Sequence, residues 1–145
     1  MHRTRRSGFT IAEMAFVIAV MALLTSVPVP AVEVLARRAR AGEARTMLAA
    51  IADRELQHFR DTGAFLACPK SGDVPRGVEA AFPTAECWKQ LGVQVDGPVR
   101  FRYGVGVTGT EFTVTAEGDL DADGVASDYR WDGRTQALTI TEALE

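Results

Sequence analysis

Apolar and polar residues follow two different patterns along this chain of 145 residues. Residues 9–32 form one predominantly apolar run that carries a single charged side chain before its end, Glu13. About 20 residues, rising ~1.5 Å each as a helix, cross the hydrocarbon layer of a membrane. The run therefore predicts one transmembrane helix. Three arginines in residues 1–8 precede it and favour a cytoplasmic N-terminus.

Two features distinguish this run from an ordinary export signal. A secretory signal peptide has an apolar stretch of about 7–15 residues followed by its cleavage site, whereas the candidate site here, Gly8, precedes the apolar run. A carboxylate inside a membrane costs roughly 2.5–3.5 kcal/mol, so Glu13 is expected to have a functional partner there. A plain signal anchor would need neither Glu13 nor a glycine before Phe9.

The sequence GFTIAEMAFVIAVMALL, which begins at Gly8, resembles the N-terminal signature of type IV pilins and the related pseudopilins. The resemblance implies that a prepilin peptidase removes residues 1–8 by cutting between Gly8 and Phe9, and that the new N-terminus at Phe9 is methylated. It also implies that Glu13 pairs with the N-terminal amine of a neighbouring subunit during assembly. Pro30 falls where the family often has a helix-kinking proline.

The same resemblance implies a function and a location. The chain would be a structural subunit, a pilin or minor pilin, held in the bacterial inner membrane by a single span and then polymerised with itself and other pilins into an extracellular, helical pilus. The inner-membrane assembly platform would be a further partner. The alternative is a pseudopilin of a type II secretion system, whose filament is periplasmic. Glu13 also has a second candidate partner, the Phe9 amine of its own chain one helical turn away.

Beyond residue 32 the pattern becomes that of an amphipathic helix. Residues 33–62 are rich in Ala, Leu, Arg and Glu, which favour helices. Apolar residues recur at spacings of three and four and predict a stripe that faces a sheet: Ala44, Leu48, Ile51, Ala52, Leu56 and Phe59. Gly63 is expected to end the helix. The arginines near its start are interpreted as a solvated face: Arg37, Arg38 and Arg40.

Prolines mark a kink and a loop. Pro28 and Pro30 each remove a backbone donor and disfavour helix at the preceding residue, which predicts a kink at residues 27–29. Residues 67–98 hold the other four prolines of the chain and are expected to form a connecting loop: Pro69, Pro75, Pro83 and Pro98.

After Pro98 the pattern changes to alternation. Every second residue in 99–107 is apolar, which predicts a strand with one buried face: Val99, Phe101, Tyr103, Val105 and Val107. Further strands are predicted at residues 111–118, 128–131 and 137–141. Antiparallel strands with one apolar face need a cover, which the helix at 33–62 supplies. The expected fold class is α+β, a long N-terminal helix packed on the small antiparallel sheet of a globular head at 63–145, a layout similar to that of type IV pilins.

The chain has two cysteines, Cys68 and Cys87. Outside the cytoplasm a disulfide between them would persist, and the loop that it closes is worth roughly 3 kcal/mol in the chain-entropy model. A metal pair or a reactive thiol is the rival interpretation. The chain lacks a Cys-x-x-Cys spacing and keeps one histidine, His58, once residues 1–8 are removed. A disulfide within the head is therefore expected.

Residues 119–128 read DLDADGVASD and carry a second chemical signal. Carboxylates at alternate positions followed by a glycine resemble the first half of an EF-hand calcium loop. The candidate ligands are Asp119, Asp121, Asp123 and Asp128. Arg130 stands where that loop has its bidentate glutamate, so a polar turn between strands is the alternative, because Asp and Gly are common in turns. If calcium binds, the other function class is a membrane-tethered, extracytoplasmic calcium-binding module; no cofactor is required for the pilin function.

Charge and motifs argue against other function classes. Removing residues 1–8 takes away three arginines and leaves 13 basic against 19 acidic residues, a net charge of −6, so nucleic acid is not expected as a partner. His58 stands alone without a nucleophile motif. The sequence has no phosphate-binding glycine loop and no zinc signature. An enzyme is therefore not expected.

Overall fold

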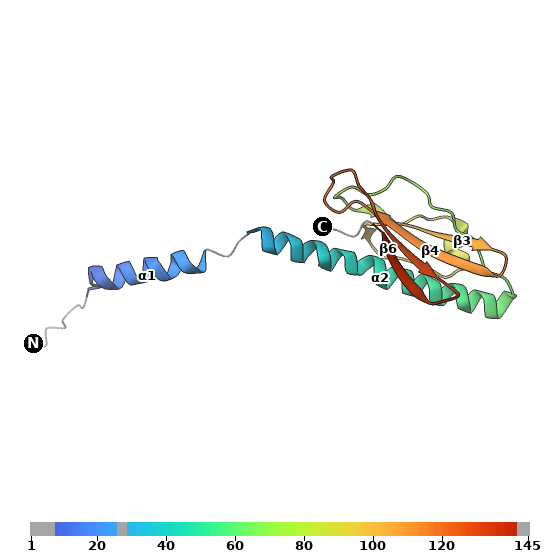
Figure 1. Cartoon of the computed structure of the whole chain (residues 1–145), viewed down its shortest axis with the longest axis horizontal. Coiled ribbons are helices and arrows are strands. Elements are labelled where there is room, and N and C mark those ends of the chain that lie inside the picture. Colours follow the sequence, from blue (N-terminus) through green and yellow to red (C-terminus); the bar gives the residue numbers. More distant parts are fainter. Residues whose placement is uncertain (1–7, 26–28, 142–145) are drawn as a thin grey trace, which may run out of the picture. The chain divides into compact units, whose positions relative to one another are not determined.

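The structure is a computed structural model that describes residues 8–25 and 29–141. The chain divides into two units, one that ends at Val34 and one that begins at Leu35. Figure 1 shows the helices and strands of both units.

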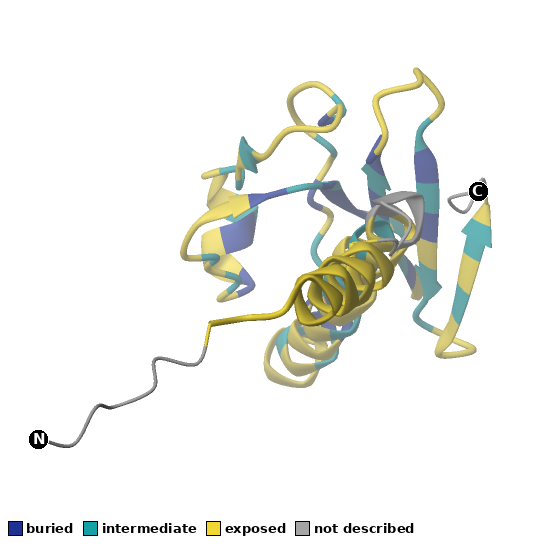
Figure 2. Ribbon diagram, turned by 90° about the vertical axis from the view of Figure 1, so that its left-hand side faces the viewer, coloured by how far each residue is buried: buried dark blue, intermediate teal, exposed yellow. Residues whose placement is uncertain are grey.

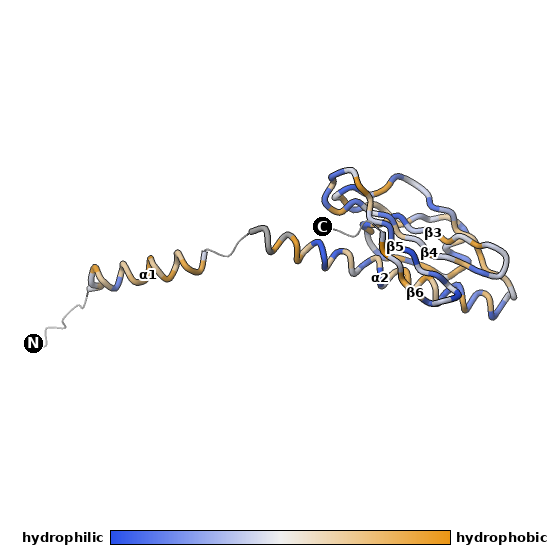
Figure 3. Tube along the Cα trace, viewed as in Figure 1, coloured by the Kyte–Doolittle hydropathy of each residue, from blue (hydrophilic) through white to orange (hydrophobic). Residues whose placement is uncertain are grey.

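Helix α1 spans Ile11–Leu24, and none of its residues is buried. It begins after an N-cap residue, Thr10, and ends at a C-cap residue, Thr25. Apolar residues run along nearly its whole length (Figure 3). Within residues 8–25 and 29–141, no helix has both the length and the apolar character needed to cross a membrane.

Helix α2 spans Val29–Thr62. Pro30 lies in its first turn, where the missing N–H of a proline leaves no helical hydrogen bond unmade. The kink predicted at residues 27–29 lies largely outside the described residues, which resume at Val29. The helix ends as predicted at Gly63, which has a φ of +79° and donates its N–H to the carbonyl oxygen of Phe59 at 2.8 Å.

Four antiparallel strands form the sheet of the head, in the order β3-β4-β5-β6. Their bounds are Arg102–Thr108, Glu111–Gly118, Ser127–Asp132 and Ala137–Thr141. The last three match the strands predicted after residue 110 to within one residue. Helix α2 packs on one face of this sheet (Figure 1). The α+β fold class, a long N-terminal helix on a small antiparallel sheet, is confirmed.

The strand predicted for residues 99–107 is divided between two sheets. Its first residue belongs to β2, Pro98–Val99, which pairs with β1, Ala80–Ala81. Strand β3 begins only at Arg102, because the backbone N–H of Arg100 donates to Glu43 of α2 at 2.9 Å instead of to another strand. The predicted alternation still holds across the break, since these side chains are buried: Val99, Phe101, Tyr103 and Val105.

The core lies between the sheet and the apolar stripe of α2. Along β4, buried residues alternate with less buried ones, and Figure 2 shows the burial of each described residue. Four of the six stripe residues are buried as predicted: Ala44, Leu48, Ile51 and Ala52. Leu56 is half-buried, and Phe59 is 39% exposed and stacks on Phe65 with ring centroids 4.4 Å apart. One acid shares the stripe, since Glu55 is fully buried.

The region predicted as a connecting loop, residues 67–98, contains strand β1 and a short helix, α3, Glu86–Gln90. The predicted disulfide between Cys68 and Cys87 is present. It joins α3 to the edge of the sheet, because Cys68 exchanges backbone hydrogen bonds with Val105 of β3 at 3.0 and 2.6 Å. The region is therefore part of the folded head.

Candidate assembly helix and candidate metal loop

Glu13 caps helix α1 within its own chain. The backbone N–H and the hydroxyl of Thr10 donate to Oε2 of Glu13 at 2.8 and 2.7 Å, and the N–H of Glu13 donates to Oγ1 of Thr10 at 3.3 Å. These reciprocal bonds form a capping box, which satisfies N–H groups that the start of a helix leaves without partners. The motif is readable as Thr10-x-x-Glu13 before an apolar run, and the sequence interpretation missed it.

The predicted processing site lies just before this cap. Gly8 is exposed, and Phe9 is 77% exposed. The Glu13 carboxylate is held at the N–H of Thr10, one residue after the amine that a cut between Gly8 and Phe9 would create. These predicted residues therefore lie together, whereas Pro30 belongs to the first turn of α2.

Helix α1 presents apolar side chains on all of its sides. Every residue from 8 to 25 is exposed, and the most exposed large residues of α1 itself are Ile11, Leu23, Leu24 and Phe16. A helix that is apolar all round is normally buried in protein or in lipid. A surface of this kind marks an interaction with another chain or with a membrane.

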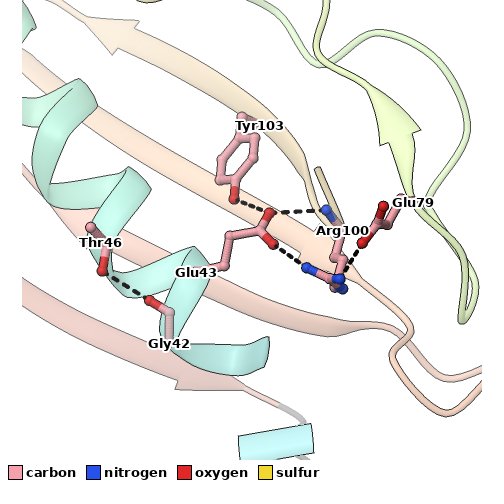
Figure 4. Close-up of polar contacts among 6 residues, drawn as sticks. All are labelled: Gly42, Glu43, Thr46, Glu79, Arg100 and Tyr103. Atoms are coloured by element: carbon pink, nitrogen blue, oxygen red, sulfur yellow. Dashed lines mark hydrogen bonds and ion pairs between the residues drawn. The ribbon is translucent and has the colours of Figure 1, made fainter. Parts of the chain in front are cut away.

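In the head, Glu43 of α2 organises a polar network that the sequence interpretation did not identify (Figure 4). Its Oε2 pairs with Nη1 of Arg100 at 3.2 Å, and its Oε1 accepts the hydroxyl of Tyr103, also at 3.2 Å. Arg100 also forms an ion pair with Glu79. Burial raises the pKa of the Tyr103 hydroxyl, and the charge and hydrogen bond of Glu43 raise it further. The network fixes α2 to the sheet and to the segment before β1.

Besides Tyr103, two glutamates of the head have shifted pKa values, Glu55 and Glu117. Burial alone would raise the pKa of Glu117, but hydrogen bonds and charges from Arg102 and Lys70 outweigh it and lower the pKa. Burial raises the pKa of Glu55, although a hydrogen bond from the N–H of Leu66 at 3.1 Å opposes the shift. Both glutamates therefore bear on stability, with opposite dependence on pH.

Three of the four aspartates predicted as metal ligands lie between β4 and β5. Asp119, Asp121 and Asp123 each offer a carboxylate oxygen, and these oxygens all lie within 4.8 Å of one another. Asp119 is 2% exposed, whereas Asp121 and Asp123 are exposed. The structure does not bring Asp128 into this group, because it lies in β5 opposite Glu117. Three of the four predicted ligands therefore converge.

Hydrogen bonds within the loop hold these carboxylates in place. The N–H of Gly124 donates to Oδ2 of Asp119 at 3.0 Å, and the N–H of Val125 donates to Oδ1 of Asp123 at 2.7 Å. Ala122 has a φ of +62°, a left-handed conformation that turns the chain between Asp121 and Asp123. The alternating acids and the glycine thus form a tight polar turn, which the sequence offered as the alternative to a calcium loop.

A cation from α2 reaches this loop. Nη1 of Arg37 pairs with Oδ2 of Asp121 at 3.2 Å. The sequence suggested a solvated face for all three arginines. Arg38 and Arg40 are exposed as predicted, whereas Arg37 is half-buried and forms this ion pair. The sequence could not show this contact, because 84 positions separate its two residues.

Comparisons of the whole chain with protein-family models, with curated proteins and with solved structures found no match.

Proposed function

We propose that the chain is a structural subunit, a pilin or minor pilin, of a type IV pilus filament. A prepilin peptidase cuts it between Gly8 and Phe9, the new N-terminus at Phe9 is methylated, and the subunit polymerises through α1. The observation that carries this proposal is α1 itself, an apolar helix with no buried residue and one acid in its first turn, directly after the candidate processing site.

In such a subunit, the exposed apolar surface of α1 is covered in two different ways, one before assembly and one after it. Before assembly, the lipid of the inner membrane covers the helix, which leaves the head on the extracytoplasmic side. After assembly, the α1 helices of neighbouring subunits cover one another. Both environments remove the same apolar side chains from water, so the free energy difference between them is small and assembly requires specific pairing.

Glu13 supplies that specific pairing in the proposed filament. A carboxylate has about four acceptor positions, and the bonds from Thr10 use one oxygen, Oε2. The remaining positions accept the ammonium group of Phe9 from a neighbouring subunit. A polar pair inside an apolar helix bundle fixes the register of the helices, because any other alignment leaves both charges unpaired.

The processing step is tested by mass spectrometry of the protein extracted from the membrane fraction of cells that also express the peptidase. The expected N-terminus is Phe9 with an added methyl group. An intact Met1, or a cut after the apolar run, would contradict the proposal.

The assembly role of Glu13 is separated from its capping role by two variants. Glu13→Gln keeps the capping box, because glutamine also serves at this position, but it removes the negative charge. Thr10→Ala weakens the cap and keeps the charge. We expect Glu13→Gln to be processed but at least tenfold depleted from sheared filaments, and Thr10→Ala to be incorporated. The reverse result would show that Glu13 acts as a helix cap alone.

A pseudopilin of a type II secretion system is the alternative within the same proposal. It would use the same processing site, Gly8–Phe9, and the same assembly helix. The two systems differ in where the filament stands, so labelling of the head on intact cells and on spheroplasts distinguishes them. Label on intact cells supports the pilus, and label on spheroplasts alone supports the periplasmic pseudopilus.

A further inference from the structure

One carboxylate oxygen in the loop between β4 and β5 lacks a partner. Asp119 is 2% exposed, and its Oδ2 accepts the N–H of Gly124. Its Oδ1 is buried and has no hydrogen-bond partner among the described residues. An ionised oxygen that is removed from water and left unpaired is strongly unfavourable, and buried charges are normally paired or coordinate a metal. A cation at this position would satisfy the unpaired oxygen of Asp119.

The neighbouring carboxylates define where that cation would lie. Oxygens of Asp119, Asp121 and Asp123 lie within 4.8 Å of one another. Calcium binds oxygen at about 2.3–2.6 Å, so two ligands on opposite sides of one ion are about 4.6–5.2 Å apart, and all three aspartates can reach a single ion. Magnesium binds oxygen at about 2.0–2.1 Å, demands near-ideal octahedral geometry and gives up its water reluctantly, so protein carboxylates alone rarely bind it.

The guanidinium of Arg37 already lies at this loop, but it pairs with only one of the three carboxylates. The Arg37 guanidinium is monovalent and contacts one of the three carboxylates, Asp121, at 3.2 Å. Both side chains are partly exposed, at 27% and 31%, so water screens the pair. Arg37 leaves the buried oxygen of Asp119 without a partner.

We propose that the loop at residues 119–124 binds one Ca²⁺ ion through Asp119, Asp121 and Asp123, and that the ion replaces the Arg37 guanidinium at Asp121. Binding exchanges one ion pair for metal–oxygen bonds, and no covalent bond changes. Because Arg37 belongs to α2, the exchange releases the contact between this part of α2 and the loop. Calcium thus controls a link between the helix and the sheet of the head. The proposal is independent of the filament function.

Calcium binding is tested by isothermal titration calorimetry of the full-length chain in detergent, after removal of metal with a chelator. We expect one site that prefers Ca²⁺ to Mg²⁺. Asp123→Asn should weaken Ca²⁺ binding at least tenfold, whereas Asp53→Asn, which neutralises an exposed acid on α2, should leave it unchanged. Circular dichroism checks that each variant is folded. No heat of binding at millimolar Ca²⁺, or equal binding by both variants, would overturn the site.

The exchange with Arg37 is tested by a second pair of variants. If the guanidinium and the ion compete for Asp121, Arg37→Gln should bind Ca²⁺ about three- to tenfold more tightly than the unaltered chain, because binding and ion pairing are reciprocally linked. Arg38→Gln removes the same charge from the next residue of α2 and should change the affinity less than twofold. An unchanged or weaker affinity of Arg37→Gln would overturn the exchange while leaving the calcium site in place.

Discussion

Glu43 holds both the backbone and the side chain of Arg100, which donate to its two carboxylate oxygens at 2.9 and 3.2 Å. The contact joins α2 to the two residues that separate β2 from β3. The buried hydroxyl of Tyr103 depends on the same carboxylate. Glu43 of α2 therefore holds the chain at Arg100, and β3 begins two residues later, at Arg102.

Replacing this acid should destabilise the head. Glu43→Ala leaves the Tyr103 hydroxyl and the Arg100 N–H without their partner, and a buried polar group left unpaired costs about 1–3 kcal/mol. We expect the free energy of unfolding to fall by about 2–3 kcal/mol, measured by urea denaturation of the full-length chain in detergent with tryptophan fluorescence as the signal. Glu86→Ala, at an exposed position of α3, is the control and should change it by less than about 0.5 kcal/mol. Equal effects of the two variants would remove the assigned role of Glu43.

Glu55 should make the head less stable as the pH rises. Burial raises the pKa of this side chain in the folded state, so the folded state binds the proton more tightly than the unfolded state does. The resulting penalty is absent below the unfolded pKa of about 4.3 and grows as the pH rises towards the folded pKa. The stability of Glu55→Gln relative to the unaltered chain should therefore increase between pH 4 and pH 7. Asp53→Asn should show no such trend, and a flat difference for Glu55→Gln would contradict the prediction.

Glu117 should show the opposite dependence on pH. Arg102 and Lys70 lower the pKa of Glu117 in the folded state despite its burial, so its ion pairs stabilise the fold above the unfolded pKa of about 4.3. This stabilisation is lost as the pH falls through the folded pKa. Glu117→Gln should be less stable than the unaltered chain by about 1–3 kcal/mol at pH 7, and the two should converge at acidic pH. Denaturation curves across this range measure the difference, and a gap that widens on acidification would refute the assignment.

Two glycines of the sheet should respond differently to the same substitution. A Cβ atom at Gly118 would lie 2.7 Å from both the carbonyl oxygen of Arg100 and the ring of Phe101, whereas a Cβ atom at Gly106 would meet nothing within 4 Å. Gly118→Ala should therefore lower the free energy of unfolding by about 1–3 kcal/mol. Gly106→Ala should leave it unchanged or raise it by about 0.4–1 kcal/mol, since alanine restricts the unfolded chain. Equal urea midpoints for the two variants would show that Phe101 does not pack closely over Gly118.

Alternation predicted most of the sheet, because along β4 and β6 every second residue is more buried than its neighbours. The break after Val99 was not predictable from the same signal, since it depends on Glu43, an acceptor 57 positions from Arg100. The core stripe of α2 was predicted from apolar residues alone, which omitted Glu55. Glu55 nevertheless lies four positions after Ile51 and three after Ala52, so the sequence did contain the helical spacing that places it in the stripe.

The candidate sites show the same division between local and distant contacts. The convergence of Asp119, Asp121 and Asp123 follows from their alternate spacing in one tight turn. Asp128 was grouped with them by sequence proximity, but pairing in β5 fixes its position. Arg37 was missed because only the packing of α2 on the head brings it to the loop. The capping box joins Thr10 to Glu13, only three positions away, so it was predictable from the sequence. It was missed because Glu13 was interpreted as an acid that needs a partner within the membrane.

The capping box also bears on the proposed processing. Thr10 keeps an extended backbone, with φ of −80° and ψ of 154°, and the helix starts only at Ile11. The Gly8–Phe9 bond, where the proposed cut would fall, therefore lies before the helix, and both of its residues are exposed, so a peptidase would not need to unwind a helical turn to reach it. Removal of residues 1–8 would leave Thr10 and Glu13 in place, so the N-terminus that the proposal assigns to the subunit would keep the cap that forms before the cut.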